Sequence, residues 1–464
     1  MKLLRNNEIF GNGIFYRSAL AIAVPIMVQQ LIQSMVSLID NFMVAGLGDI
    51  CMSGVNVANQ ILFVFMIFTV TIMTSGGIYL AQYRGAEDPV GMQHAFRFKL
   101  ITGMLAFIPY ILVCIIFPRQ VLSLMVIGNT EASLILDQGV IYMRTIFFMG
   151  IQMTMSMCIA SSLRDTGEVR IPLIISGGAA LTNTFFNWVL IYGHLGAPAL
   201  AVRGAALATV IARTLELAAY IIICVRKKPA FIIRPLEVFN INKTLYVNML
   251  KKAGMVLISE MTWVLSETIT TAVYNGRGGA DVVSGMAAGF AIANLFFVAF
   301  GGTTTATSVI LGSTLGSGKL DLARKQKTWI LSGGFVLGLI MMVFGMATTL
   351  IIPVVFGNLS AGAIHICRRM VILNAAFIPV WIFLNCQLAV SRAGGDTAMG
   401  AVADALMTIF ISLPLLFILA IFTDMGPVRL YFWFKMVDFV RIIVFHYWLK
   451  RERWLRNLTK EGAE

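Results

Sequence analysis

Six candidate carboxylates lie within long apolar stretches of the chain, where a charged side chain is costly. Two of them, Glu216 and Asp438, lie within one helical turn of Arg213 and Arg441, so pairing explains them equally well. The other four are Asp40, Glu260, Glu267 and Asp404. A charge at the centre of a bilayer costs roughly 2.5–3.5 kcal/mol on insertion scales, so such a group normally faces a cavity or a partner. In a cavity it can take up and release a proton or bind Na⁺. The alternative is structural pairing with basic residues that lie in the same stretches, namely Arg144, Arg213, Lys435 and Arg441.

Asp40 has the most informative surroundings of the four. Gln33 precedes it by two helical turns on the same face, and Pro25 lies further down the same apolar segment. A proline inside a helix removes one backbone hydrogen bond and creates a kink point. Asp40 beyond a hinge at Pro25 could therefore couple cation binding to helix bending. Glu260, with Ser259 beside it, is the next candidate.

Seven amide side chains also lie in apolar stretches and could line a substrate cavity. They are Gln33, Asn56, Asn183, Asn187, Asn294, Asn374 and Asn385. Asn183 and Asn187 are one helical turn apart and point the same way. Hydrogen bonding between helices is an equally good explanation for most of these amides.

Twelve apolar segments position these residues. A spanning helix needs about 20 mostly apolar residues, and open sheet edges cannot face lipid, so we expect helices. The predicted segments are 18–46, 53–82, 94–117, 133–160, 171–192, 202–225, 247–274, 283–314, 327–352, 365–390, 398–422 and 428–449.

The composition agrees with a polytopic membrane protein. Of the 464 residues, 58% are hydrophobic and 12% are charged, against about 25% charged in soluble proteins. This excludes a disordered chain and argues against a soluble enzyme. The segments on one side of the predicted membrane hold 25 Lys and Arg residues, and those on the other side hold 6. This bias predicts a multi-pass protein of the cell (inner or plasma) membrane with both termini in the cytoplasm. The net charge of +13 then faces anionic lipid, not nucleic acid.

The remaining motifs predict neither an enzyme nor a cofactor. The six cysteines form no CxxC pair, and the four histidines show no metal-ligand spacing. The stretch GSTLGSGKL (312–320) fails the phosphate-loop pattern at both ends, and no GxSxG nucleophile motif occurs. We therefore expect no metal, no cofactor and no catalytic residue.

The two halves of the chain resemble each other. Gly54 and Gly85 match Gly285 and Gly316 at an offset of 231 residues, and LRDTGEVRIP (163–172) parallels SRAGGDTAMG (391–400) at an offset of 228. A six-helix repeat predicts two parallel lobes related by a pseudo-two-fold axis along the membrane normal, with a cavity between them. The predicted domains are an N-terminal lobe (1–225), a cytoplasmic linker (226–246) and a C-terminal lobe (247–464).

The sequence resembles the multidrug and toxic compound extrusion (MATE) family, in its prokaryotic form. The resemblance covers essentially the whole chain. It rests on Pro25 with LIDNFMVAGLGD (38–49), LRDTGEVRIPLIIS (163–176), NTFFNWVLIYGHLGAPALAVRGAALATVIA (183–212), SRAGGDT (391–397) and WLRNLT (454–459).

The resemblance implies a secondary antiporter in which H⁺ or Na⁺ influx drives export of amphipathic, often cationic compounds. It implies that Asp40 is the coupling carboxylate of the first helix, with Gln33 and Asn183 as polar neighbours. The family often has an acid where Asn187 stands, and an amide cannot titrate. Glu260 and Glu267 lie nearest to the acid that some members use in the seventh helix, and Asp404 resembles a subset of bacterial members.

Two other functions remain in competition with this one. A flippase for a lipid-linked precursor, found in similar folds, would favour a basic central cavity, but the basic residues within the segments are few. A membrane receptor or scaffold does not explain a six-helix repeat with buried carboxylates. The expected partners are a small organic substrate and membrane lipid, and the expected assembly is a monomer.

Overall fold

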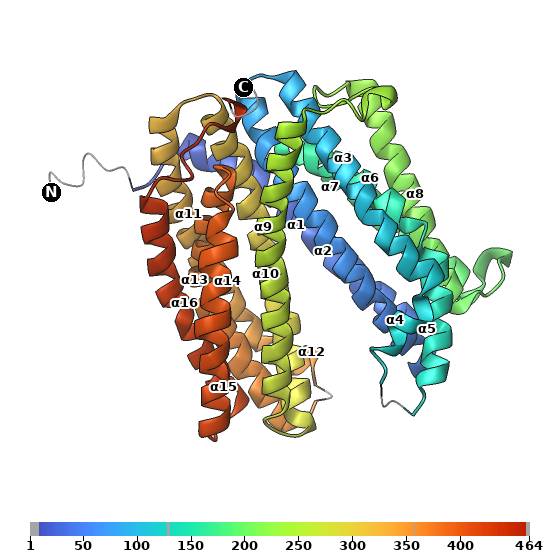
Figure 1. The fold of residues 1–464 in the computed structure, drawn as a ribbon. Coiled ribbons are helices and arrows are strands. Elements are labelled where there is room, and N and C mark those ends of the chain that lie inside the picture. Colours follow the sequence, from blue (N-terminus) through green and yellow to red (C-terminus); the bar gives the residue numbers. More distant parts are fainter. Residues whose placement is uncertain (1–8, 128–129, 358, 461–464) are drawn as a thin grey trace. The chain divides into compact units, whose positions relative to one another are not determined.

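The protein is helical throughout the part that the structure, a computed structural model, describes: residues 9–127, 130–357 and 359–460. These residues contain no strand (Figure 1). The first half contains α1 (Gly13–Ala45), α2 (Asp49–Gly85), α3 (Pro89–Ile111), α4 (Pro118–Ser123), α5 (Ala132–Ile146), α6 (Met149–Asp165), α7 (Arg170–Tyr192) and α8 (Ala201–Lys227). The second half contains α9 (Lys243–Asn275), α10 (Ala280–Gly316), α11 (Leu320–Ala347), α12 (Ile352–Val355), α13 (Ala361–Ala393), α14 (Ala405–Met407), α15 (Leu413–Phe422) and α16 (Pro427–Lys450).

Most of the predicted spans are confirmed as long apolar helices, and the chain is a multi-pass membrane protein. Among the described residues, nine helices are long and apolar enough to cross a membrane, and the bent pair α5–α6 makes a tenth. Helices α9 and α16 coincide with the seventh and twelfth predicted segments, but they fall outside this set. In α16 the reason is its charge, since it carries Arg429, Lys435, Asp438 and Arg441. The count of twelve therefore stays a prediction for these two helices.

The predicted segment 133–160 is a single stretch in sequence but two helices in the structure. Helices α5 and α6 meet at Phe147 and Phe148 with a bend of 52°. Gly150 lies in the first turn of α6, where the ring of Phe107 packs so closely that a Cβ atom would overlap it. The bend is thus accompanied by a close helix approach that a larger residue would block.

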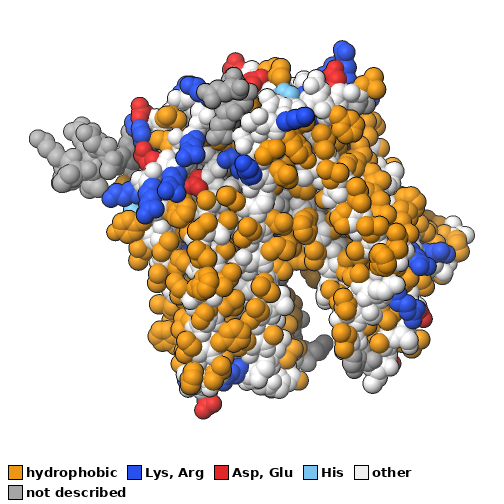
Figure 2. Space-filling view, viewed as in Figure 1, with side chains coloured by type: hydrophobic (Ala, Val, Ile, Leu, Met, Phe, Trp, Pro, Cys, Tyr) orange, Lys and Arg blue, Asp and Glu red, His pale blue; other side chains and the backbone are white. Residues whose placement is uncertain are grey.

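The chain divides into two compact units, which we describe separately. The N-terminal unit comprises Val28–Arg84 and Asp88–Leu250, and the C-terminal unit comprises the described residues of Met1–Met27, Gly85–Glu87 and Lys251–Glu464. In the N-terminal unit α8 contacts α5, α6 and α7, and in the C-terminal unit α13 contacts α10, α11 and α16. On the face of each unit that Figure 2 shows, hydrophobic side chains cover the broad middle. Such a surface suits a lipid solvent.

An ion pair with a fully buried lysine joins α3 to α6 in the N-terminal unit. The Lys99 side chain is 0% exposed, and its Nζ lies 2.7 Å from Oδ2 of Asp165. The same ammonium donates to the hydroxyls of Ser161 and Ser162 at 3.0 and 3.2 Å. Gly76 of α2 makes room for the lysine stem, because a Cβ there would overlap Cγ of Lys99. The charge is therefore compensated by three partners inside a packed region.

The tail after α16 packs against the end of α13 in the C-terminal unit. Trp454 and Leu458 are fully buried, and the amide of Asn457 donates to the carbonyl of Gly316 at 3.0 Å. Gly394 lies against the backbone carbonyl of Trp454 so closely that a Cβ atom would overlap it. The WLRNLT segment (454–459) is thus packed into the C-terminal unit.

We expect Gly394→Ala to displace this tail and to destabilise the C-terminal unit by about 1–3 kcal/mol, the usual cost of overpacking. The measurement is the rate of limited proteolysis between residues 451 and 460, together with the thermal unfolding temperature in detergent. Gly254→Ala is the matched control, because a Cβ at Gly254 meets nothing within 4 Å. Equal proteolysis of the two variants would contradict the prediction.

Candidate functional site

Asp40 lies in a cluster of amide and hydroxyl groups within the N-terminal unit. Nδ2 of Asn187 donates to Oδ1 of Asp40 at 2.6 Å and to Oδ1 of Asn183 at 3.3 Å. Oγ1 of Thr209 on α8 lies 3.3 Å from the Asn183 amide. Helix α1 thus supplies the carboxylate, α7 supplies two amides one turn apart, and α8 supplies a hydroxyl.

The Asn183 amide fits this cluster best with its nitrogen facing Asp40. In that orientation the nitrogen donates to both carboxylate oxygens at 2.9 Å, the oxygen accepts from Thr209 at 3.3 Å, and the bond from Asn187 to Asn183 is replaced. Asn183 and Asn187 are 6% and 2% exposed, and Asp40 is half-buried. Oδ1 of Asn187 is buried without a hydrogen-bond partner among the described residues. Both amides therefore direct N–H donors at the carboxylate, while the Asn183 oxygen faces the Thr209 hydroxyl.

Asp40 has no basic partner in the part of the chain that the structure describes. No Lys or Arg nitrogen lies within 4 Å of its oxygens there. Arg213 on α8 instead pairs with Glu216 at 2.7 Å. The carboxylate is thus contacted by amide dipoles, with Arg213 acting on it only from a distance, so a cation that reaches it gains a direct charge interaction.

The acidic candidates of the C-terminal unit differ from Asp40, because each is paired. Oε1 of Glu260 lies 2.9 Å from Nη2 of Arg392, and Oε1 of Glu267 lies 3.4 Å from Nζ of Lys435. Both pairs join α9 to another helix, α13 for Glu260 and α16 for Glu267. The paired arrangement that the sequence left as an alternative is thus present for both residues.

Asp404 shares one arginine with a second acid. Arg441 lies 3.1 Å from Oδ1 of Asp404 and donates to Oδ1 of Asp438 at 2.9 Å. Asp404 ends a π-helical turn (Met399–Asp404), and a second such turn (Thr408–Ser412) supplies two hydroxyls to Arg441. Wide turns of this kind are rare and often occur at functional sites. Here they position α14 and its flanks around the half-buried Arg441 guanidinium.

The remaining predicted cavity residues separate into buried and exposed groups. Asn374 is buried and accepts a hydrogen bond from the Tyr431 hydroxyl at 2.8 Å. Asn385 bonds to Thr303 and Thr304 on α10 at 3.0 Å each. Gln33, Asn56 and Asn294 are exposed on their own units. For Asn374 and Asn385 the structure gives the interhelical bonds that were the alternative to substrate contact.

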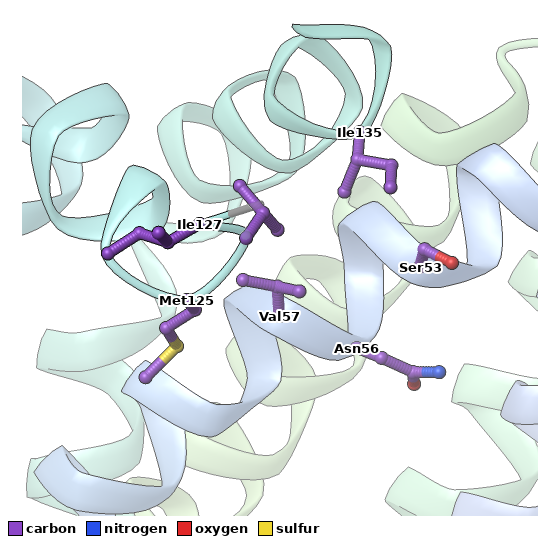
Figure 3. A pocket seen from close by; sticks show the side chains of 7 residues that line it. Ser53, Asn56, Val57, Met125, Ile127 and Ile135 are labelled. Atoms are coloured by element: carbon purple, nitrogen blue, oxygen red, sulfur yellow. The ribbon is translucent and has the colours of Figure 1, made fainter. Parts of the chain in front are cut away.

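A cavity of about 330 Å³ lies beside Asn56 in the N-terminal unit. Its lining comes from α2, α5 and the segment between α4 and α5, and consists of Ser53, Asn56, Val57, Met125, Val126, Ile127 and Ile135. Figure 3 shows the Asn56 amide directed away from Val57 and Met125. Its lining combines the polar side chains of Ser53 and Asn56 with five apolar ones, a mixture that can accept an amphipathic ligand.

The sequence reasoning missed three features of these sites. Thr209 was not singled out, because a lone threonine in an apolar helix usually bonds back to its own backbone, as Thr209 also does to Ala205 at 3.1 Å. Arg392 was assigned to a loop, whereas it ends α13 close enough to pair with Glu260. The pairing of Arg441 with Asp438 was open from their spacing and is confirmed at 2.9 Å, but no sequence pattern indicated that Asp404, 34 positions before Asp438, shares this arginine.

Comparison with known proteins places the chain in a family. The family model described as MatE matches residues 25–189 and again residues 256–420. The two matched segments begin 231 residues apart, the offset found between the glycine pairs of the two halves. The predicted internal repeat is thereby confirmed.

Curated relatives and solved structures agree with this match. A probable multidrug resistance protein NorM of Photorhabdus laumondii is 27% identical over 443 residues, covering 92% of this chain and 93% of that protein. An uncharacterized transporter, YisQ, of Bacillus subtilis is 22% identical, covering 92% of each. The crystal structure of a MATE mutant matches with a TM-score of 0.84 at 15% identity, covering 97% of each chain. A mutant of the Vibrio cholerae MATE transporter VcmN matches with a TM-score of 0.82 at 15% identity, covering 95% of this chain and 98% of that one. The fold is therefore shared with these structures.

Proposed function

This chain belongs to the MatE family of multidrug and toxic compound extrusion transporters, and from that premise we propose that it is a secondary active antiporter. It exports amphipathic or cationic small molecules in exchange for H⁺ or Na⁺ by alternating access. The relatives named as multidrug resistance proteins support this choice of substrate. Asp40 carries the coupling ion.

The observation that carries this proposal is the difference between Asp40 and the other acids. Asp40 accepts hydrogen bonds from amides and has no basic partner among the described residues, whereas Glu260, Glu267 and Asp404 each lie within 3.4 Å of a Lys or Arg nitrogen. A carboxylate already neutralised by a neighbouring Lys or Arg gains little from a proton or Na⁺. Asp40 therefore supplies the coupling site, and Glu260, Glu267 and Asp404 act through their ion pairs.

The N-terminal cluster also suits the coupling ion chemically. The amides of Asn183 and Asn187 now donate to the ionised Asp40; on binding of Na⁺ or a proton they turn their oxygens toward the ion or the protonated carboxyl, beside the Thr209 hydroxyl. Gln33, two turns before Asp40, and Asn56, at the edge of the cavity, extend this polar surface toward the substrate. Asn294, Asn374 and Asn385 supply the corresponding polar groups of the C-terminal lobe.

Helix α1 is the element that bends during transport. Pro25 lies inside α1, and the boundary between the two compact units crosses this helix between Met27 and Val28. A proline two residues before that boundary supplies a kink point where the helix has already lost a hydrogen bond. Binding at Asp40 and bending at Pro25 thus act on one helix.

The protein works as a monomer in the cell membrane, with membrane lipid around it and both termini in the cytoplasm. The excess of Lys and Arg in one set of connecting segments supports this orientation. The lobes are residues 1–225 and 247–464, joined by the linker 226–246.

A lipid-precursor flippase finds less support. It would need a cluster of basic groups available to a diphosphate. Three of the four basic residues within spans instead lie beside carboxylates: Arg213 with Glu216 at 2.7 Å, Lys435 with Glu267 at 3.4 Å, and Arg441 with Asp438 at 2.9 Å.

The experiment that tests the proposal is transport of a fluorescent cationic dye in proteoliposomes, under separately imposed H⁺ and Na⁺ gradients. We expect one of the two gradients to drive dye against its own gradient. Failure of both gradients with several dyes would refute multidrug antiport and favour a dedicated substrate.

We expect Glu260→Gln to keep gradient-driven transport within about threefold of the wild type. Glu260 already shares its charge with Arg392 at 2.9 Å, and the pair is partly exposed, so its loss costs roughly 0–1 kcal/mol. The initial rate of dye transport is the measurement. A complete loss of coupling in a folded Glu260→Gln protein would move the coupling site to the C-terminal unit.

A further inference from the structure

The ammonium of Lys435 lies inside a group of aromatic rings in the C-terminal unit. Its Nζ is 5.4 Å from the ring centroid of Trp381, 5.3 Å from that of Tyr431 and 5.1 Å from that of Phe434. All three distances lie within the range of about 6 Å in which ring faces attract cations. Oε1 of Glu267 lies 3.4 Å from the same ammonium nitrogen. Three rings and one carboxylate therefore surround a single positive charge.

The polar ends of two of these rings are held by other groups. Nε1 of Trp381 donates to Oδ2 of Asp438 at 2.8 Å, and Asp438 in turn accepts from Arg441. The Tyr431 hydroxyl donates to Asn374 at 2.8 Å. These bonds fix where the rings lie, so the site does not depend on Lys435 to keep its shape. We call Trp381, Tyr431, Phe434 and Glu267 the aromatic cage.

The contact between Lys435 and Glu267 is longer than that of a strong ion pair. Its 3.4 Å exceeds the 2.7–2.9 Å that is typical of strong charge-assisted bonds. The Glu267 side chain is 37% exposed, whereas that of Lys435 is 14% exposed. The Glu267 carboxylate thus lies on the accessible side of the cage. The flexible Lys435 side chain occupies the space between the rings.

We propose that the aromatic cage is a binding subsite for an organic ammonium cation, and that Lys435 is its tethered resting occupant. Aromatic faces combined with a carboxylate are the chemistry that recognises alkylated ammonium groups. A bound cation replaces the Lys435 ammonium, which swings out of the cage on its four-carbon stem. The net charge between the rings is the same before and after the exchange.

This inference rests on the proposed function for its physiological meaning, because it names the class of compound that the exporter takes. Its test does not rest on that function. Equilibrium binding in detergent needs no ion gradient and no coupling through Asp40. A protein that binds cations in the cage but fails in proteoliposomes would contradict the antiport proposal alone.

The experiment is isothermal titration of purified full-length protein with benzyltrimethylammonium chloride. We expect Lys435→Ala to bind the probe with a Kd about tenfold lower than the wild type, because the competing ammonium is gone. In the Lys435→Ala background, Trp381→Leu is expected to reverse this gain. Lys327→Ala is the matched control: Lys327 lies over a single ring, that of Trp454, at 6.0 Å, and its removal should leave the Kd unchanged.

An unchanged or higher Kd in folded Lys435→Ala would overturn the proposal, as would a tenfold gain that survives Trp381→Leu. An equal gain in Lys327→Ala would also overturn it, since the effect would then be one of net charge. Folding is checked by size-exclusion chromatography. If Lys435→Ala does not fold, Lys435→Gln replaces it, and a single Trp381→Leu variant of the wild type must weaken binding.

Discussion

Asp40→Asn is expected to reduce gradient-driven accumulation of dye from roughly fiftyfold to about onefold. One charge moved through 100 mV releases about 2.3 kcal/mol, and each 1.4 kcal/mol corresponds to a tenfold ratio of concentrations. Asparagine has nearly the same shape as aspartate and can still bond to Asn187 and Asn183. It lacks the negative charge that holds a proton or Na⁺, so the ion and the substrate would no longer be coupled.

The measurement is the steady-state dye ratio across proteoliposome membranes, with the active ion gradient imposed. Glu260→Gln is the matched control, since it removes a carboxylate of the C-terminal unit that Arg392 already neutralises. Downhill dye movement in Asp40→Asn shows that the variant is folded and open to substrate. Full accumulation by a folded Asp40→Asn protein would remove Asp40 from the coupling site.

Lys99→Met should lower the free energy of unfolding by about 3–5 kcal/mol, the usual cost of breaking a buried ion pair. Lys99 is fully buried, and Asp165, 14% exposed, would remain as a charge with its cation removed. The two serine hydroxyls that now accept from Lys99 would also lose a partner. The loss is read as a lower thermal unfolding temperature in detergent.

The control for Lys99→Met is Arg119→Met. Arg119 and Asp137 also form an ion pair at 2.7 Å, but their side chains are 57% and 52% exposed. Solvent screens such a pair, so we expect little change in unfolding temperature. The double variant Lys99→Met with Asp165→Asn should regain much of the lost stability, because no buried charge is left. Equal stability of Lys99→Met and Arg119→Met would show that the buried pair contributes nothing.

The fold class followed from the sequence because the bilayer limits the possible structures. Long apolar segments in lipid must form helices that satisfy their own backbone bonds. The glycine matches at offset 231 indicated the repeat, and the family match begins twice at that same offset. In α16, by contrast, charged residues such as Arg429 and Lys435 make the segment too polar for hydropathy alone to identify it as a span.

The candidate residues were also visible in the sequence, since a carboxylate in an apolar helix is costly wherever it points. The sequence could name Asp40, Glu260, Glu267 and Asp404 and put Asp40 first from its neighbours Gln33 and Pro25, but it could not tell which acids are paired, because their partners lie on other helices. Arg392 is 132 positions from Glu260, and Lys435 is 168 positions from Glu267. Only side-chain packing decides that these acids meet a cation while Asp40 meets amides.

The sequence by itself therefore determined the helices, the repeat and the set of acids that need an explanation. Tertiary structure alone decided which acid is neutralised, and it assembled the aromatic cage from three helices, α9, α13 and α16. The physical reason is the distance along the chain over which each interaction acts. Hydropathy and backbone hydrogen bonding act within a segment, whereas the charge state and cation affinity of Asp40 or Glu267 depend on atoms a few ångströms away that the chain brings from distant positions.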